Sequence, residues 1–153
     1  TFHLNKRLRG ISEICFVLRA KVHIKGFWFK RYNRAWQILV AGECDKIYGD
    51  SFERAGEEIH QIGNNVTIRF EQMDFGEKGT KSLVICGSTP LEKNTIILKF
   101  AKDGVEEQRM VEFMGTKTKQ SFEIEPIYGV NDVSLVFLPG SNFNFTSICF
   151  CEA

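Results

Sequence analysis

Apolar and polar residues alternate along short stretches of this chain, and turn residues separate the stretches. The clearest stretch runs from Gly129 to Phe150. Val133, Leu135 and Phe137 alternate there with other residues, as in a strand with one buried face, before a Pro-Gly-Ser-Asn sequence breaks the run and apolar residues resume. The sequence therefore predicts a strand, a turn and a strand that close the domain as a hairpin.

A similar pattern occurs near the N-terminus, from Gly10 to Phe29. It has a glycine, a branched residue, a small polar residue and an acid, then an apolar strand, a break and an aromatic-ended strand. We expect strands at Ile14–Leu18 and Val22–Phe29, and hence a second hairpin. Its apolar side chains are too many to stay in water at low cost, so we expect the hairpin to pack on the domain or on a second copy in an exchanged dimer.

Further strands of four to eight residues are predicted at intervals of about ten, with no convincing helical stripe. They fall within residues 32–40, 66–70, 82–86, 95–100, 108–113 and 121–127. Asp103-Gly104 is a strong hairpin turn signal, whereas the charged and glycine-interrupted residues 53–58 are predicted to be a loop. This spacing is typical of an all-β fold, an antiparallel β-sandwich or jelly roll.

Composition fits one folded domain. The chain has 153 residues, is 43% hydrophobic and contains 14 Phe, which argues against disorder. No apolar run approaches the roughly 18 residues of a membrane helix, so no membrane partner is expected. Thr1 opens no signal-peptide pattern, and a Thr start suggests a fragment of a longer protein, either extracellular or cytoplasmic.

The charge is unevenly distributed. Residues 1–36 hold nine Lys or Arg and one acid, although the net charge of the whole chain is +1. A basic arm can bind nucleic acid, but these bases interleave with apolar residues as on the wet face of strands, and a solvated face is the favoured interpretation. The five cysteines have no CxxC spacing, so free thiols are favoured over a zinc site.

Four blocks, in order, carry a family resemblance. They are GECDKIYGDSF (Gly42 to Phe52), IGNNVTIRFEQMDFGEKG (Ile62 to Gly79), LVICGSTPLEKNTIILKF (Leu83 to Phe100) and LVFLPGSNFNF (Leu135 to Phe145). From Phe27 to Phe150, roughly four-fifths of the chain, their order resembles family-6-type carbohydrate-binding modules, which are galactose-binding-like jelly rolls, especially those in the C-terminal region of family-2 glycoside hydrolases such as β-galactosidases.

The resemblance implies a domain division. Residues 30–153 would form the module, and residues 1–29 would be a strand pair resembling the end of a preceding module. The alternative is that the first hairpin belongs to this domain and adds strands to a sheet edge.

The resemblance also implies a set of sugar-binding candidates. Such modules combine an aromatic platform with side-chain amides that bridge hydroxyls. Asn144 matches the family's cleft asparagine, whereas Lys119 and His60 stand near its tryptophan and tyrosine positions. The cleft is therefore lost or rebuilt, with Tyr48, Phe75 and Tyr128 as replacement aromatics. Core packing is favoured for Phe75. Asn142 and Asn144 either bind sugar or cap their turn.

A structural calcium ion is common in the family. Glu43 matches the family's N-terminal acid and Asp45 lies beside it, but Thr146 stands where a further aspartate is expected. Calcium prefers six to eight hard oxygen ligands, so the missing carboxylate weakens the implied site.

Catalysis has little support in the sequence, because no motif frames the acid pairs Asp45 with Asp50 or Glu57 with Glu58. The leading hypothesis is a non-catalytic carbohydrate-binding module of a bacterial glycoside hydrolase of β-galactosidase type, which binds galactoside-containing glycans. The alternative is a structural or dimerisation domain of the same enzyme with a degenerate sugar cleft. Its partners would be a glycan, other domains of the parent enzyme or a second copy through the first hairpin.

Overall fold

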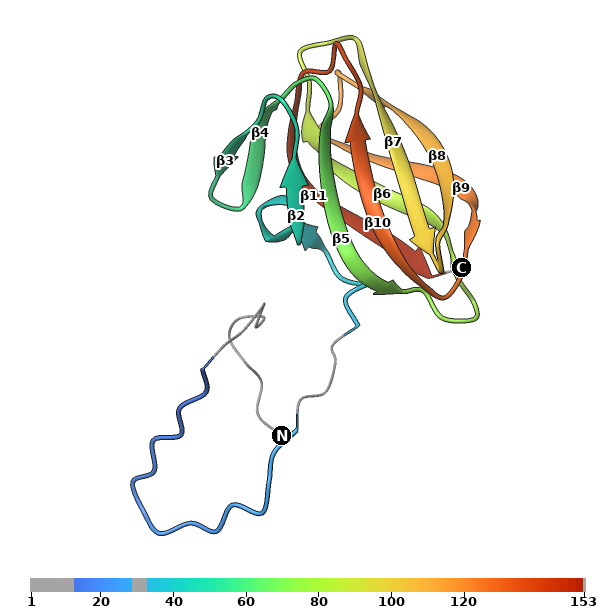
Figure 1. Cartoon of the computed structure of the whole chain (residues 1–153). Helices are drawn as coiled ribbons and strands as arrows, with labels where there is room; N and C mark the ends of the chain where they lie inside the picture. The colour runs from blue at the N-terminus through green and yellow to red at the C-terminus, as the bar shows by residue number, and fades with distance from the viewer. Residues whose placement is uncertain (1–12, 29–32, 153) are drawn as a thin grey trace. The chain divides into compact units, whose positions relative to one another are not determined.

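The structure is a computed structural model that describes residues 13–28 and 33–152. The chain divides into two units, Thr1–Arg31 and Tyr32–Ala153. The second unit holds every strand of the described residues (Figure 1). Within the described ranges, no helix is long and apolar enough to cross a membrane.

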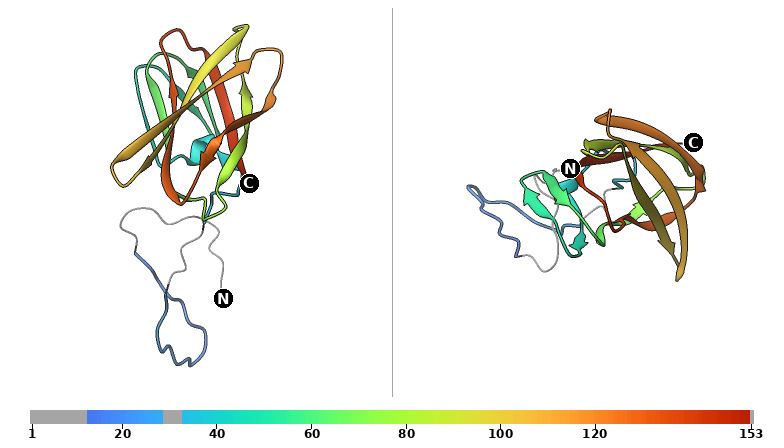
Figure 2. Two further views of the ribbon diagram at one scale, coloured as in Figure 1. Left: turned by 90° about the vertical axis from the view of Figure 1, so that its right-hand side faces the viewer. Right: turned by 90° about the horizontal axis from the view of Figure 1, so that it is seen from above.

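The second unit is a sandwich of two antiparallel sheets (Figures 1 and 2). In chain order its elements are β1 (Leu39–Val40), η1 (Ala41–Glu43), β2 (Lys46–Tyr48), β3 (Glu53–Ala55), β4 (Glu58–Ile62), β5 (Val66–Asp74), β6 (Thr80–Ser88), β7 (Lys93–Lys102), β8 (Val105–Met114), β9 (Lys119–Ile127), β10 (Val130–Phe137) and β11 (Phe143–Glu152). Sheet A has the order β3-β4-β11-β6-β9, with β1 also on β11, and sheet B has the order β2-β5-β10-β7-β8. The predicted all-β sandwich is confirmed.

The core lies between the sheets because each long strand alternates buried and exposed side chains. In β7, for example, Ile96, Leu98 and Phe100 are buried and the residues between them are not. Aromatic rings fill the centre, and Phe113 packs edge-on against Phe143 at a centroid distance of 4.9 Å. Phe75 is 1% exposed and belongs to this core, as the favoured interpretation expected.

The predicted turn at Asp103-Gly104 joins β7 to β8. Lys102 pairs with Val105, and the two turn residues have φ values of 50° and 81°. Both residues therefore adopt the left-handed backbone conformation that a two-residue hairpin turn requires. Local turn chemistry was sufficient to identify this hairpin.

The closing hairpin predicted for Gly129 to Phe150 is wrong. Both strands exist, but β10 pairs with β5 and β7 in sheet B, whereas β11 pairs with β4, β6 and β1 in sheet A. The Pro139-Gly140 turn carries the chain from one sheet to the other. Alternation identifies a strand with one buried face, but it does not say on which side of the core the strand lies.

Two other local predictions are corrected. Residues 53–58 are not a loop, because β3 and β4 pair as a hairpin from Glu53↔His60 to Ala55↔Glu58. Most of residues 33–40 is not a strand, because a turn bonds Gln37 N to Arg34 O at 3.0 Å and only Leu39–Val40 joins a sheet. Asn33 favours that turn, since its side-chain oxygen accepts a hydrogen bond from Ala35 N at 3.0 Å.

The first hairpin is also absent as a β-structure. Residues 13–28 contain no strand, only a bend at Arg19 and Ala20, although Phe16 and Phe27 are in ring contact at 5.2 Å. The end of the predicted second strand at Phe29 lies outside the described residues. An isolated two-stranded ribbon is at best marginal in water, which explains why alternation alone was misleading here.

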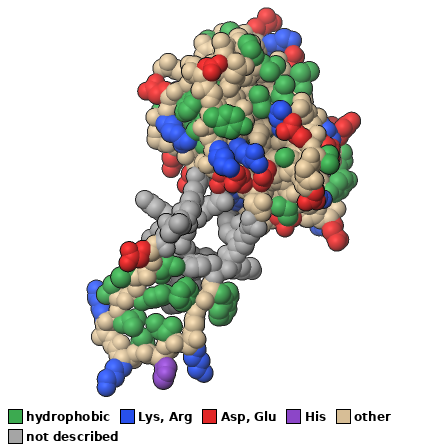
Figure 3. Space-filling model, in the orientation of Figure 1, with side chains coloured by type: hydrophobic (Ala, Val, Ile, Leu, Met, Phe, Trp, Pro, Cys, Tyr) green, Lys and Arg blue, Asp and Glu red, His purple; other side chains and the backbone are tan. Residues whose placement is uncertain are grey.

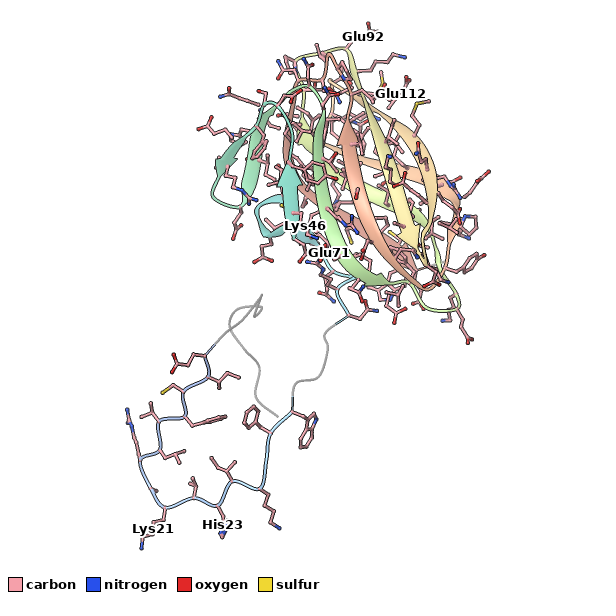
Figure 4. All side chains as sticks on the ribbon, viewed as in Figure 1. Lys21, His23, Lys46, Glu71, Glu92 and Glu112 are labelled. Atoms are coloured by element: carbon pink, nitrogen blue, oxygen red, sulfur yellow. The ribbon has the colours of Figure 1, made fainter. Side chains whose placement is uncertain are left out.

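Ion pairs cover much of the outer face of sheet B. Lys46 Nζ lies 2.7 Å from Glu71 Oε1 (Figure 4), and Arg69 lies 2.6 Å from Asp132. None of the five cysteines, all of which lie within the described ranges, forms a disulfide bond; Cys44 is buried, whereas Cys15 and Cys151 are exposed.

Candidate functional site

A groove of about 540 Å³ lies on the outer face of sheet A, where β4, β11 and β6 run side by side beside the start of β9. Its lining residues are polar or small: Glu58, His60, Cys86, Gly87, Ser88, Thr118, Lys119, Asn144 and Thr146. None of these residues is Phe, Tyr or Trp. The groove can therefore offer hydrogen bonds to a polar ligand but no stacking platform.

Irregular pairing on both sides of β11 shapes this groove. The register of β11 shifts against β4 between Phe143 and Phe145, and against β6 between Phe145 and Ser147. Such bulges re-aim side chains and are frequent beside binding sites. Asn144 lies at the first shift and Thr146 at the second, so each register shift contains one residue that lines the groove.

The Asn144 side chain is fixed by the bulge. Its Oδ1 accepts a hydrogen bond from Gln61 N at 2.9 Å, and Gln61 has a φ of 51°, which a non-glycine residue rarely adopts. Its Nδ2 lies 3.5 Å from Ser88 Oγ, which is a weak contact. The amide thus uses its oxygen for the fold and retains donor capacity for a ligand.

Glu58 is the centre of a second polar network. His60 lies two residues along β4 on the same face, and its Nε2 donates to Glu58 Oε2 at 2.7 Å. Thr146 Oγ1 donates to Glu58 Oε1 at 3.1 Å. Hydrogen bonds from His60 and then from Thr146 hold the pKa of the Glu58 carboxyl below its ordinary value of 4.5. Glu58 is therefore an ionised acceptor at neutral pH, and both of its oxygens are engaged.

Gly87 allows β6 to lie close against β11 beside the groove. A Cβ added at this position would lie 2.4 Å from the backbone oxygen of Asn144 and 2.6 Å from the Phe143 ring. These distances are far below ordinary contact, so no larger residue fits without movement of β11.

The sequence-predicted sugar-binding residues fall into two groups. Asn144, Lys119 and His60 come together in the groove from β11, β9 and β4, although they are far apart in the chain. Asn142, Tyr48 and Tyr128 are exposed and do not line it. Tyr48 lies on β2 of sheet B, and the Tyr128 ring lies over Gly79.

Several groove residues were not predicted to bind a ligand. Glu58, Ser88 and Thr118 were assigned no binding role, and Glu58 falls in a segment that was expected to be a loop. Thr146 was noted only as a departure from a calcium pattern. The signal that identifies them is the pairing of β4, β11 and β6, which short-range periodicity does not contain.

The residues around Glu43 and Asp45 do not fit the calcium site that the family implies. Asp45 forms an ion pair with Arg34, and its Oδ2 accepts a hydrogen bond from Glu71 N at 2.8 Å. Across the described ranges, no group of three or more His, Cys, Asp or Glu is arranged to hold a metal ion. The carboxylate expected to bind calcium instead neutralises an arginine.

A smaller hollow of about 310 Å³ lies elsewhere on the module. It is lined by Asn33, Trp36, Asp74, Phe75, Gly76, Glu77, Lys78 and Glu152. Trp36 packs edge-on against Phe75 at 5.7 Å, and Asn33 Nδ2 donates to Asp74 O at 2.8 Å. These contacts fasten the entry of the chain to the β5–β6 turn, which gives the hollow a structural role.

Comparison with known proteins identifies relatives of the fold. No protein-family model matches the chain, and no curated protein matches it. Among solved structures, a family 6 carbohydrate-binding module from Clostridium stercorarium in complex with cellobiose is similar, with a TM-score of 0.62 and 22% identity over 78% of this chain and 95% of that one. A family 6 module from Clostridium cellulolyticum in complex with xylose has a TM-score of 0.63 and 20% identity, covering 77% and 98% of the two chains.

A β-1,3-glucan-binding family 6 module from Bacillus halodurans is also similar, with a TM-score of 0.57 and 20% identity over 78% of this chain and 97% of that one. These matches confirm the expected resemblance at the level of the fold. The described sandwich has the architecture of family 6 carbohydrate-binding modules.

Proposed function

We propose that this chain is a non-catalytic carbohydrate-binding module and that it binds its glycan in the groove between β4, β11, β6 and β9. The observation that carries the proposal is the convergence of Asn144, Lys119 and His60. These three residues were matched to the family's cleft positions from sequence, and they line one groove.

The chemistry of the groove suits a polyhydroxylated ligand. Asn144 Nδ2, the Lys119 ammonium and the hydroxyls of Ser88 and Thr118 are groups that can hydrogen-bond to sugar hydroxyls. Because the lining residues include no Phe, Tyr or Trp, apolar stacking contributes little and affinity at one site is weak. A weak site becomes effective when several modules of one protein bind the same polymer.

A catalytic role is disfavoured by the number of acids in the groove. Glycoside hydrolysis usually needs two carboxyl groups on either side of the scissile bond. Glu58 is the only carboxylate among the lining residues, and both of its oxygens already accept hydrogen bonds. Binding without turnover is the function that this constellation supports.

The sequence resemblance makes a β-galactoside the first ligand to test and a bacterial β-galactosidase-type enzyme the expected parent. The similar structures provide other ligands, because they were solved with cellobiose and xylose or are described as binding β-1,3-glucan. A useful panel therefore contains galactosides, cello-oligosaccharides, xylo-oligosaccharides and β-1,3-glucan.

Calorimetric titration of the full chain against this panel tests the proposal. We expect millimolar to high-micromolar binding to at least one glycan, a loss of at least about tenfold in affinity for Asn144→Ala, and no loss for the matched control Asn142→Ala, since about 1.4 kcal/mol of lost interaction is tenfold. Absence of binding to every glycan, or equal loss in both variants, would overturn it.

A structural or dimerisation domain is the second candidate. It is favoured by one observation, namely that Lys119 and His60 stand where the family's aromatic platforms are expected. Light scattering on the isolated chain, together with a pull-down against the parent's catalytic region, distinguishes the two. A defined dimer or a tight complex without glycan binding would favour assembly.

A further inference from the structure

Two apolar runs in residues 13–28 leave their side chains in water (Figure 3). One set of six side chains is 41% to 56% exposed: Ile14, Phe16, Leu18, Val22, Ile24 and Phe27. Val17 and Trp28 are each 85% exposed. An exposed apolar surface of this kind marks an interaction site.

Each run corresponds in sequence to one of the last two strands of the module. Residues 11–18 match β10, so that Ile14, Phe16 and Leu18 stand at the positions of Val133, Leu135 and Phe137. Residues 22–29 match Phe143–Phe150, so that Val22, Ile24 and Phe27 stand at the positions of Phe143, Phe145 and Ile148. All six counterparts in the module are 0% exposed.

One ring contact joins the two runs, whose counterparts β10 and β11 lie in opposite sheets. β10 and β11 are not paired to each other, since they lie in opposite sheets and meet across the core. Likewise residues 13–28 contain no strand pairing, yet the rings of Phe16 and Phe27 lie 5.2 Å apart. The module counterparts of those rings, Leu135 and Ile148, enter the core from opposite sides.

The exposure pattern agrees with this arrangement. The half-exposed set is the one whose counterparts point into the core, whereas the two most exposed residues, Val17 and Trp28, match the outward-facing Val136 and Cys149. Figure 4 shows the short basic connection between the runs, with Lys21 and His23 labelled. The segment therefore has an inner face that is only half covered.

We propose that residues 11–29 are the last two strands of a second β-sandwich of this fold, and that their inner faces dock onto the remaining strands of that sandwich, the counterparts of β1 to β9. β10 lies between β5 and β7, and β11 lies between β4 and β6. In such a partner each run gains a hydrogen-bonded neighbour on both sides. Without such neighbours an isolated ribbon is marginal in water, which explains why residues 13–28 form no strand by themselves.

A second copy of this chain is not a suitable partner. In every copy the gap between β5 and β7 is filled by β10, and the gap between β4 and β6 is filled by β11. The partner must be a sandwich that lacks both strands. This inference is independent of whether the groove of the module binds a glycan.

A duplication experiment tests the proposal. A copy of residues 33–129 is inserted directly before Gly10 of the full chain, which supplies counterparts of β1 to β9 to the segment. Amide hydrogen exchange is then measured at residues 13–28. We expect exchange to slow by at least about a hundredfold relative to the original chain, because the amides enter a core sheet. The same fusion with Phe16→Asp is the control and is expected to lose the protection.

A second measurement does not depend on the folding of the fusion. The two runs are transplanted into the module of the original chain in place of its last two strands. Residues 11–18 replace Val130–Phe137 and residues 22–29 replace Phe143–Phe150. The control uses residues 10–17 and 21–28, which turns every inner side chain outward. We expect a cooperative thermal transition for the transplant alone. No protection in the fusion together with no difference between transplant and control would overturn the proposal, as would protection of residues 13–28 in a dimer of the original chain.

Discussion

The side-chain oxygen of Asn144 accepts a hydrogen bond from the backbone N–H of Gln61 at 2.9 Å, across a separation of 83 residues. This bond fastens β11 to the bulge of β4 and leaves the amide nitrogen directed to the groove side of the residue, where Ser88 is its nearest partner. The Asn144 side chain therefore both holds β11 to β4 and lines the candidate site.

The two roles of Asn144 can be separated. Asn144→Asp retains an acceptor for Gln61 N–H but removes the amide donor, whereas Asn144→Ala removes both. We expect Asn144→Ala to lower the free energy of unfolding by about 1 kcal/mol and Asn144→Asp to change it by less than about half of that. Both should lose glycan binding. Urea unfolding and calorimetric titration provide the two measurements, and equal destabilisation by both variants would contradict the assigned role of the oxygen.

The Glu58 network predicts a pH-dependent contribution to stability. Because the folded-state pKa of Glu58 is lowered, its contribution is fully present above the ordinary value of 4.5 and is lost as the pH falls through the folded-state pKa. Glu58→Gln should therefore destabilise the protein at pH 7, by no more than about 1 kcal/mol because the pair with His60 is solvent-exposed.

Unfolding measured at pH 7 and pH 3 checks this expectation, since the difference between wild type and Glu58→Gln should shrink at the lower pH. Glu57→Gln changes the adjacent exposed acid and is the matched control. A difference that grows toward pH 3 would have the wrong sign and would exclude the network as its source.

The close approach of β6 to β11 at Gly87 leaves no room for a larger side chain. Gly87→Ala should destabilise the protein by about 2 to 3 kcal/mol, because its Cβ meets the backbone of Asn144 and the Phe143 ring rather than a flexible side-chain end. Gly104→Ala is the comparison: nothing lies within 4 Å of its added Cβ, and only its φ of 81° is unfavourable, for a cost of about 1 kcal/mol. Thermal unfolding should rank the two variants in this order.

Substitution of Lys119 by tryptophan is expected to strengthen glycan binding. It stands near the position where the family resemblance expects a tryptophan platform, and it lines the groove. Lys119→Trp should tighten binding of a neutral oligosaccharide by about two- to tenfold, as an added aromatic contact is worth about 0.5–1.5 kcal/mol. Lys117→Trp, two residues earlier and outside the groove lining, is the control. Equal effects of the two substitutions would indicate nonspecific stickiness.

We expect Asp45 to stabilise the fold through its ion pair with Arg34 rather than to bind calcium. Asp45→Ala should cost about 3 kcal/mol, because both side chains are about one-tenth exposed and an unpaired charge would remain on Arg34. Asp50→Ala, which removes an exposed hydrogen bond to Asn65, should cost less than about 1 kcal/mol. Melting temperatures with calcium and with chelator should be the same. A calcium-dependent rise that disappears in Asp45→Ala would restore the metal site.

The sequence by itself determined most of the long strands of the module and which of their faces is buried. The alternation of Ile96, Leu98 and Phe100, or of Val133, Leu135 and Phe137, is a property of consecutive residues, and so is the turn at Asp103-Gly104. Once such a segment has strand neighbours, its alternation fixes which side chains enter the core, because side chains in a strand point to opposite faces at every step.

Only the tertiary structure decided which strands are neighbours. The hairpin predicted at Gly129–Phe150 failed because β10 and β11 present equivalent apolar faces to one core from opposite sheets, a choice made by partners distant in sequence. The groove depends on the same choice. The family resemblance named Asn144, Lys119 and His60, but Glu58 and Thr146 became site residues only when β4 was set beside β11. Strand pairing depends on hydrogen bonds between backbone segments that are distant in sequence, and the alternation within a single strand contains no information about it.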